Sequence, residues 1–202
     1  MDAELEAQEK KRFDLAQEIL DKNPSIGFIS ALIIAGDKLS AQRADEMLEK
    51  GSSFDAALVF VGSYARLEWA LQAFKDKKVS YDHLLDILPE LWRGSDPDDT
   101  NLEFRELWQD AFTRNNNKTV CDSEPLPKGI LNIYRGQDDD GSIGIAWTLN
   151  EKIAQKFANG AALRQYNRKG IVYRARVKSK KVLGYLKLRN EEEVIVNPFD
   201  LE

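Results

Sequence analysis

The chain has almost none of the residues that build metal and thiol chemistry. Among 202 residues it has one cysteine, Cys121, and one histidine, His83. It can therefore form no internal disulfide and no four-ligand zinc site of cysteines and histidines. Any serine or cysteine mechanism with a histidine base would have to use His83, which follows Asp82 in a segment with helical periodicity. We interpret His83 as a surface or capping residue, and we expect no metal.

Long hydrophobic runs are also absent. The longest apolar stretch, residues 26–36, is interrupted by Gly27 and Ser30 and is shorter than the roughly 20 residues that span a bilayer. Residues 1–12 alternate acidic and basic side chains and lack the apolar segment of a signal peptide. A hydrophobic content of 43% with only 12 glycines and 6 prolines excludes collagen-like, low-complexity and wholly disordered chains. The composition predicts a folded, cytoplasmic protein that makes no use of a membrane.

The net charge of −5 conceals two parts of opposite sign. From residue 126 onward there are 14 lysines and arginines against 9 aspartates and glutamates, a net charge of +5, whereas the first 125 residues carry 15 against 25, a net charge of −10. Residues 152–190 contain 12 cationic side chains and no carboxylate. This basic stretch is expected to face an anion, and the two parts are expected to face different partners.

The hydrophobic pattern changes at the same point. In the first 125 residues apolar side chains recur at helical spacing, a break follows at Asn23-Pro24, and Ser52-Ser53 offers an N-cap to a long apolar stripe that begins at Phe54. From residue 126 the period becomes two, which predicts strands over 130–135, 143–149, 171–177, 182–188 and 191–196. One helix, capped by Asn150, is expected over 150–158. We predict an α+β chain, with a helical region over 1–125 and a small mixed-sheet domain over 126–202.

Two segments of the sheet domain could contact a ligand. Arg135 ends a strand and precedes Gly136, so its guanidinium could bind a phosphate or carboxylate where the glycine lets a ligand approach closely. Trp147 and Thr148 lead directly into the helix that Asn150 caps. Taken singly, each segment also fits a purely structural role, as an edge-strand arginine in water or as a core tryptophan beside a strand threonine.

A third segment places three carboxylates, Glu191, Glu192 and Glu193, at the start of a β-branched strand. The pleat of a strand is expected to put Glu191 and Glu193 on one face and Glu192 on the other. Two carboxylates at such a short distance raise each other's affinity for protons, which suits a site that stabilises a cation and accepts a proton. Taken alone, the same run also fits a solvated charged face.

The order of these motifs resembles that of the ADP-ribosyltransferases of the arginine-serine-glutamate class. Tyr-Arg-Gly lies on a first strand, a Trp-Thr strand runs into a helix that ends in Phe-Ala, and Glu-x-Glu-Val lies on a late strand. The resemblance covers residues 129–198. It implies the fold of that family, NAD as a substrate and no metal cofactor.

The resemblance also assigns roles to individual residues. It implies that Glu193 is catalytic and that Glu191, the upstream glutamate, orients or deprotonates the acceptor. It implies a cofactor-binding set of Arg135 on the NAD phosphates, Gly136, Thr148, Trp147, Phe157 and Arg164. The phosphate-nicotinamide loop of the family would correspond to 159–169 and its target-recognition loop to 186–190. The sequence departs from the family at Ala146, where a serine is usual, so that either Thr148 supplies the hydroxyl or the site is weakened.

The function implied is that of a mono-ADP-ribosyltransferase, which cleaves NAD and transfers ADP-ribose to a macromolecular acceptor, in the first instance a protein arginine. Small enzymes of this kind occur as phage and bacterial effectors, and the helical region would recognise the target or regulate the site. Two alternatives stay open: a non-catalytic NAD- or anion-binding module, favoured by Ala146, and a nucleic-acid-binding protein that uses the basic stretch over 152–189. NAD consumption separates the first alternative from the enzyme, and a salt-sensitive nucleic-acid affinity that survives loss of Arg135 would support the second.

Overall fold

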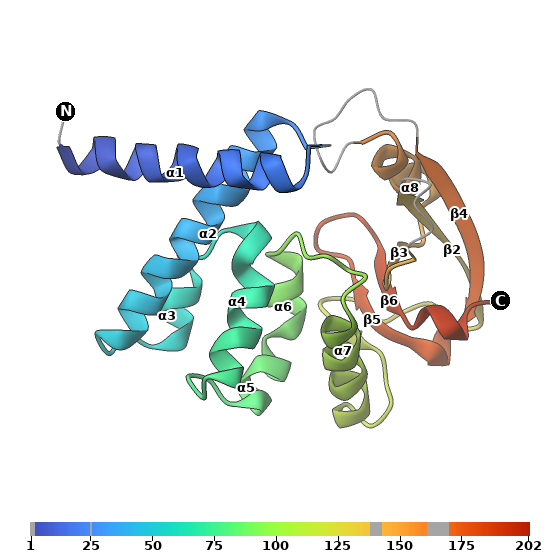
Figure 1. Cartoon of the computed structure of the whole chain (residues 1–202). Coiled ribbons are helices and arrows are strands. Elements are labelled where there is room, and N and C mark those ends of the chain that lie inside the picture. The colour runs from blue at the N-terminus through green and yellow to red at the C-terminus, as the bar shows by residue number, and fades with distance from the viewer. Residues whose placement is uncertain (1–2, 25, 138–142, 161–169) are drawn as a thin grey trace. The chain divides into compact units, whose positions relative to one another are not determined.

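A computed structural model describes residues 3–24, 26–137, 143–160 and 170–202 of the chain (Figure 1). Its contacts divide the chain into two compact units. The first unit takes in Met1–Leu84 and Gly94–Pro97, and the second takes in Leu85–Arg93 and Asp98–Glu202. None of the described helices has both the length and the hydrophobicity needed to cross a membrane.

The first unit is helical, as the apolar periodicity predicted. Its helices are α1 (Ala3–Lys22), α2 (Phe28–Glu49), α3 (Phe54–Leu58), α4 (Ser63–Lys75) and most of α5 (Tyr81–Asp86). Helix α1 ends at the predicted break, and the Ser53 side chain caps α3 by accepting a hydrogen bond from the backbone N–H of Ala56. The apolar stripe that begins at Phe54 is divided between α3 and α4. The Asp37 carboxylate accepts a hydrogen bond from the backbone N–H of Tyr64 at 2.9 Å, which stabilises the start of α4 as a separate helix.

Small side chains let α1 and α2 approach closely. Ala16, Ala31 and Ala35 are completely buried between partly buried leucine and isoleucine side chains of the two helices. His83 lies on α5, and its Nε2 atom lies 2.8 Å from Oδ1 of Asp55 on α3. The surface role expected for His83 is therefore that of a partly exposed link between two helices.

The second unit contains a six-stranded sheet in the order β1-β5-β6-β3-β2-β4. The strands are β1 (Val120–Cys121), β2 (Ile130–Gln137), β3 (Ala146–Thr148), β4 (Ile171–Lys178), β5 (Val182–Leu186) and β6 (Glu193–Val196). Strand β1 pairs with β5 in parallel and every other pair is antiparallel. The prediction of an α+β chain with a mixed sheet is confirmed. The two-residue strand β1 was not predicted, because so short a segment carries no period.

Helices cover one face of this sheet and a hydrophobic cluster lies on the other. The cluster contains Leu131, Ile133, Trp147, Val177, Val182, Tyr185, Val194 and Val196. On the opposite face, Gly184 of β5 lies under the ring of Trp108, because a Cβ there would stand 2.5 Å from that ring. Trp108 belongs to α7 (Leu102–Arg114), which lies in the same compact unit as α6 (Leu88–Arg93) and the strands.

Helix α8 (Glu151–Ala158) packs directly on strand β2. The side chain of Asn150 caps it by accepting a hydrogen bond from the backbone N–H of Lys152 at 3.1 Å, as the sequence predicted. A Cβ on Gly136 would lie 1.8 Å from the carbonyl oxygen of Ala154, so only glycine lets helix and strand come this close. Gly136 thus serves the packing of α8.

Strand β6 is shorter than predicted. It begins at Glu193, and Glu192 before it has a φ of 47°, in the left-handed region that strand residues avoid. The expected strand over 191–196 is wrong at its start, and the alternation that was to place Glu191 and Glu193 on one face and Glu192 on the other does not apply. Strand β5 likewise ends at Leu186, and β3 spans three residues instead of the seven expected over 143–149.

Candidate functional site

Three adjacent strands place Tyr134, Thr148 and Glu193 in one row across the sheet. Tyr134 of β2 pairs with Thr148 of β3, and Thr148 pairs with Glu193 of β6. Directly paired residues of antiparallel strands project their side chains to the same face. The register therefore brings together two residues that the resemblance assigned, Thr148 and Glu193, and adds the phenol of Tyr134 beside them.

The hydroxyl of Thr148 fixes the backbone on both sides of this row. It donates a hydrogen bond to the carbonyl oxygen of Glu191 at 2.5 Å and accepts one from the backbone N–H of Asn150 at 3.0 Å. The side chain of Thr148 is buried, so both bonds are shielded from water. Thr148 thereby links the turn that carries Glu191 to the start of α8.

The carboxylate of Glu193 lies in a partly buried setting among charged groups. Its Oε1 atom accepts a hydrogen bond from the indole Nε1 of Trp92, on α6, at 3.0 Å. Loss of hydration raises the pKa of Glu193 to about 7, with smaller contributions in the same direction from the charges of Glu191 and Asp99. Near neutral pH this carboxylate can therefore exist both as a charged group and as a proton carrier.

The guanidinium of Arg135 is bound to a carboxylate of the same unit. Its two terminal nitrogens donate to the two oxygens of Asp99, at 2.5 Å and 3.0 Å, and one of them also donates to the carbonyl oxygen of Ala146 at 2.7 Å. The remaining nitrogen, Nε, donates to the side chain of Gln137. Asp99 also accepts the backbone N–H of Ala146 at 2.9 Å. Arg135 and Asp99 thus form a two-pronged, largely buried ion pair that fixes the start of β3.

Position 146, where the family has serine, acts through its backbone. Ala146 donates its N–H to Asp99 and offers its carbonyl oxygen to Arg135. Gly144 makes room for the same contact, because a Cβ there would lie 2.2 Å from Oδ2 of Asp99. The hydroxyl beside Glu193 in the sheet register is that of Thr148.

The other expected cofactor-binding residues lie apart from this row. Trp147 is buried in the hydrophobic cluster and donates its indole N–H to the carbonyl oxygen of Gly144. Gly136 faces α8, and Phe157 lies partly buried on that helix. Arg164 and residues 161–169 of the loop expected over 159–169 lie outside the described residues.

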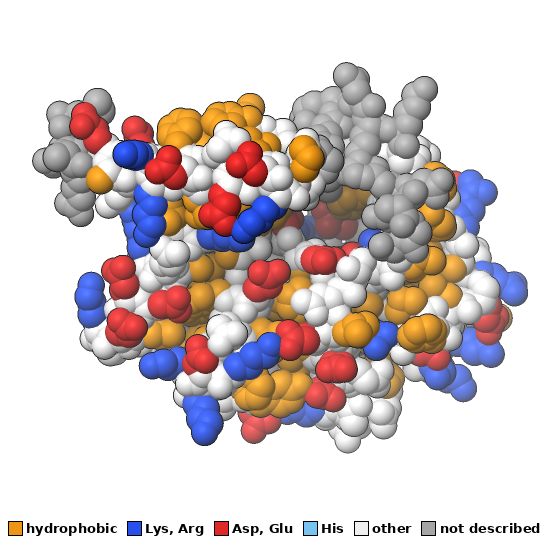
Figure 2. Space-filling view, viewed as in Figure 1, with side chains coloured by type: hydrophobic (Ala, Val, Ile, Leu, Met, Phe, Trp, Pro, Cys, Tyr) orange, Lys and Arg blue, Asp and Glu red, His pale blue; other side chains and the backbone are white. Residues whose placement is uncertain are grey.

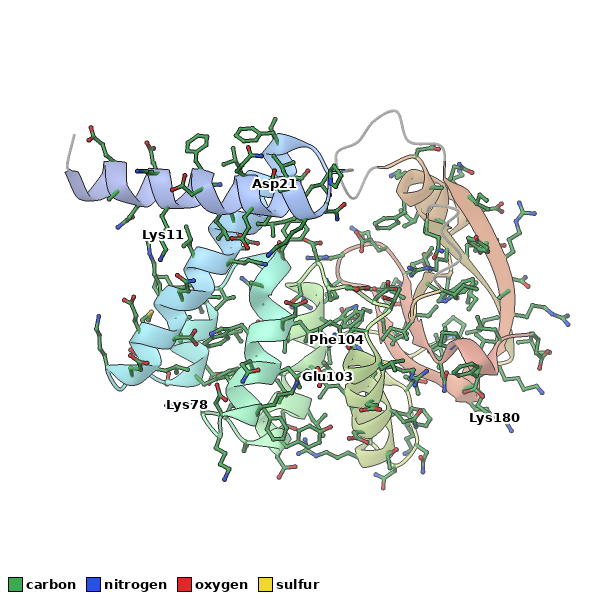
Figure 3. All side chains as sticks on the ribbon, viewed as in Figure 1. Lys11, Asp21, Lys78, Glu103, Phe104 and Lys180 are labelled. Atoms are coloured by element: carbon green, nitrogen blue, oxygen red, sulfur yellow. The ribbon has the colours of Figure 1, made fainter. Side chains whose placement is uncertain are left out.

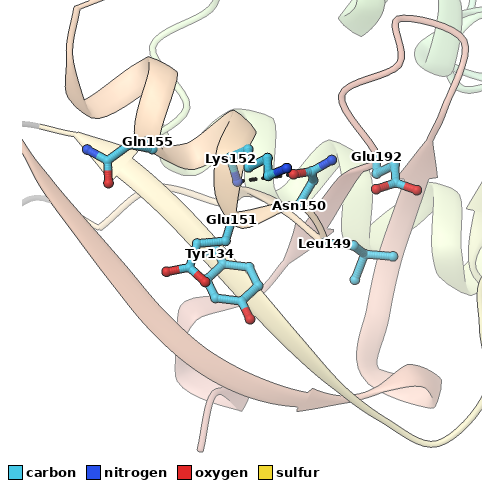
Figure 4. Close-up of a pocket in the computed structure, with 7 residues that line it drawn as sticks. All are labelled: Tyr134, Leu149, Asn150, Glu151, Lys152, Gln155 and Glu192. Carbon is cyan, nitrogen blue, oxygen red and sulfur yellow. Dashed lines mark hydrogen bonds between the residues drawn. The ribbon is translucent and has the colours of Figure 1, made fainter.

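A cavity of about 610 Å³ opens beside the row (Figure 4). Its lining consists of Tyr134, Leu149, Asn150, Glu151, Lys152, Gln155 and Glu192. Tyr134 and Glu192 are the sequence neighbours of Arg135 and Glu193, and the remaining residues come from α8 and the two positions before it. The cavity therefore offers both polar and apolar surface, and its carboxylates are those of Glu151 and Glu192.

Many side chains of the basic stretch meet carboxylates from elsewhere in the second unit. Arg174 pairs with Glu151, Lys181 with Asp200, and Lys187 with Glu124. Glu202 takes both Arg176 and Lys178. Figure 2 shows blue basic side chains with red acidic ones among them where β4 lies in Figure 1. The charge that this edge offers to an anion is consequently smaller than the sequence count suggests.

Within the described residues no group of three histidine, cysteine, aspartate or glutamate side chains is arranged to hold a metal ion. No family model matches the chain, and no curated protein or solved structure was found to match it.

Two residues that contact the site, Trp92 and Asp99, were not predicted. Both precede the strands, within the region over 1–125 that was predicted to be helical. Their contacts span 101 and 36 positions of the sequence, a separation that no local pattern reports. The only available signal was the resemblance itself, since its arginine and its glutamate each needed a buried partner.

Proposed function

We propose that the second unit is a mono-ADP-ribosyltransferase that uses NAD as its substrate and Glu193 as its catalytic residue. The observation that carries the proposal is the Glu193 carboxylate, held by an indole N–H and adjacent to Thr148 in the sheet. The order of Arg135, Thr148 and Glu193 along the chain, on which the family resemblance rests, also supports the proposal.

The reaction breaks the bond between C1′ of the nicotinamide ribose and the ring nitrogen of nicotinamide. The bonding electron pair leaves with nicotinamide, whose positive charge is thereby neutralised, and positive charge develops on the ribose. An acceptor lone pair then forms a bond to C1′, and the acceptor releases one proton. A carboxylate next to the ribose stabilises the developing charge more strongly than the ground state, which accelerates the reaction.

The position of Glu193 suits this task because the carboxylate has lost much of its hydration. A charge that water screens poorly interacts more strongly with a nearby oxocarbenium ion. The raised pKa of about 7 means that the charged form predominates only above neutral pH. Activity that depends on this form should consequently fall as the pH drops below about 7.

Glu191 is proposed to serve the acceptor. Thr148 holds its carbonyl oxygen, and the charge of Glu191 acts on Glu193 although the two residues do not share a strand. A guanidinium acceptor would be attracted by this pair and would lose its proton to Glu191. The acceptor class therefore proposed is a protein arginine, reached in the cytoplasm of the producing or infected cell.

The ion pair of Arg135 with Asp99 limits anion binding by Arg135 equally in the enzyme and in the non-catalytic alternative. Asp99, Gln137 and Ala146 already accept hydrogen bonds from the guanidinium of Arg135. Arg135 can therefore bind a diphosphate only through its remaining N–H donors, or after Asp99 has moved away. An anion-binding module without turnover would have the same fold and would consume no NAD.

Mass spectrometry of a host lysate incubated with the protein and isotope-labelled NAD tests the proposal. We expect a labelled ADP-ribose adduct on a defined residue of one or a few proteins, and its loss with Glu193→Gln. Absence of any adduct, together with absence of free nicotinamide, would eliminate the enzyme.

A further inference from the structure

The hydrogen bond between Trp92 and Glu193 joins residues 101 positions apart. Trp92 lies on α6 and is only 3% exposed. Its ring meets those of Phe104, labelled in Figure 3, and Trp108 edge to face, with centroids 6.4 Å and 5.7 Å away. Both of these aromatic residues belong to α7 and are completely buried. The indole N–H is therefore fixed in place before any ligand arrives.

The charged and titratable groups around Glu193 oppose one another. Glu191, on the turn before β6, and Asp99, before α7, both act to raise the pKa of Glu193, in addition to its burial. The charge of Arg189, on the same turn as Glu191, acts to lower that pKa, and so does the hydrogen bond from Trp92. Of the two, the hydrogen bond from Trp92 has the larger effect.

We propose that Trp92 is a positioning residue of the NAD-cleaving site, whose indole N–H orients the Glu193 carboxylate and favours its ionised form. The catalytic part of this inference rests on the proposed function, whereas the effect on the charge of Glu193 does not. A fixed donor to Oε1 holds the carboxylate group in one orientation, and in this proposal the other oxygen faces the ribose. Helix α6, which precedes the strands, thereby becomes part of the site.

A direct titration of Glu193 tests this role. Carbon-13 NMR of glutamate carboxyls, with the Glu193 signal assigned by its absence in Glu193→Gln, gives the pKa in the unmodified chain and in Trp92→Phe. Phenylalanine keeps an aromatic ring but has no N–H, so we expect the pKa to rise by about one unit. The acidic limb of the pH profile for nicotinamide release should move upward by the same amount, with little change at pH 9.

Trp69→Phe is the matched control. Trp69 is also buried and donates its indole N–H to a carboxylate, Oδ1 of Asp45, at 2.8 Å, but it lies in the first unit. Its substitution should leave both the pKa of Glu193 and the pH profile unchanged. An equal shift in the two variants would mean that general loosening of the fold is responsible, and would overturn the inference.

The unmodified chain provides a test that survives if Trp92→Phe fails to fold. The indole N–H resonance of Trp92 should titrate with the same midpoint as the Glu193 carboxyl and should lose this titration in Glu193→Gln. A pKa of Glu193 that stays fixed in a folded Trp92→Phe, or a Trp92 resonance that ignores pH, would refute the role of Trp92. If the carboxyl shifts as expected but the unmodified chain releases no nicotinamide, the proposed function fails and the effect on the charge of Glu193 holds.

Discussion

Replacing Glu193 by glutamine should stabilise the second unit at neutral and alkaline pH. The folded chain raises the pKa of Glu193 from 4.5 to about 7, so the folded state binds this proton more tightly than the unfolded state does. That contribution to stability is complete below pH 4.5 and is lost as the pH rises through 7. The glutamine side chain has nearly the same shape and does not titrate.

The size of the effect follows from the two pKa values. A shift from 4.5 to about 7 corresponds to about 3 kcal/mol, since one pKa unit is about 1.4 kcal/mol. We expect Glu193→Gln and the unmodified chain to have similar free energies of unfolding at pH 4.5. Above pH 8 the variant should be more stable by up to about 3 kcal/mol.

Urea denaturation at a series of pH values measures this difference. Tryptophan fluorescence follows the second unit well, because that unit holds Trp92, Trp108 and Trp147, three of the four tryptophans. Glu192→Gln is the matched control, since it removes the adjacent charge but leaves the bond between Trp92 and Glu193. Parallel stability curves for Glu193→Gln and the unmodified chain would refute the buried, proton-binding setting of this carboxylate.

Three further substitutions test other parts of the site. Glu191→Gln should abolish transfer to an arginine acceptor while hydrolysis of NAD to ADP-ribose and nicotinamide persists, and equal transfer by the variant and the unmodified chain would contradict the acceptor role. Arg135→Ala should weaken NAD binding and also destabilise the unit by about 3 kcal/mol, because it leaves the Asp99 carboxylate buried without its partner. Calorimetric unfolding should show part of that loss restored in the double variant Arg135→Ala with Asp99→Ala. Gly136→Ala should lower the melting temperature by several degrees, since its Cβ would meet the backbone of α8, and an unchanged melting temperature would contradict that packing.

Elements with a strong local signal were predictable from the sequence. The break after α1, the cap of α8 by Asn150 and strands β2 and β4 follow from capping residues and from a period of two. The end of β5 and the start of β6 were not predictable in this way. Asn190 and Glu192 have left-handed backbone conformations that turn the chain before β6 begins, and a run of glutamates does not indicate such a turn.

The candidate site was predictable only in part. The sequence order pointed to Thr148 and Glu193, which the sheet register then brings side by side. It could not indicate that Arg135 is held by Asp99, or that Trp92 meets Glu193, because both contacts join segments far apart in the chain. The resemblance assigned Trp147 to the cofactor-binding set, yet its ring lies in the hydrophobic cluster.

Release of nicotinamide from NAD by the purified protein is the most direct test of the account. The assay compares the unmodified chain, Glu193→Gln and Glu106→Gln, a change at an exposed glutamate of α7, at pH 8 in the presence of host lysate as a source of acceptor. We expect release by the unmodified chain, a rate close to it for Glu106→Gln, and a loss of at least about a hundredfold for a folded Glu193→Gln. No release by the unmodified chain, or an undiminished rate in Glu193→Gln, would contradict the central claim that the carboxylate of Glu193 cleaves NAD.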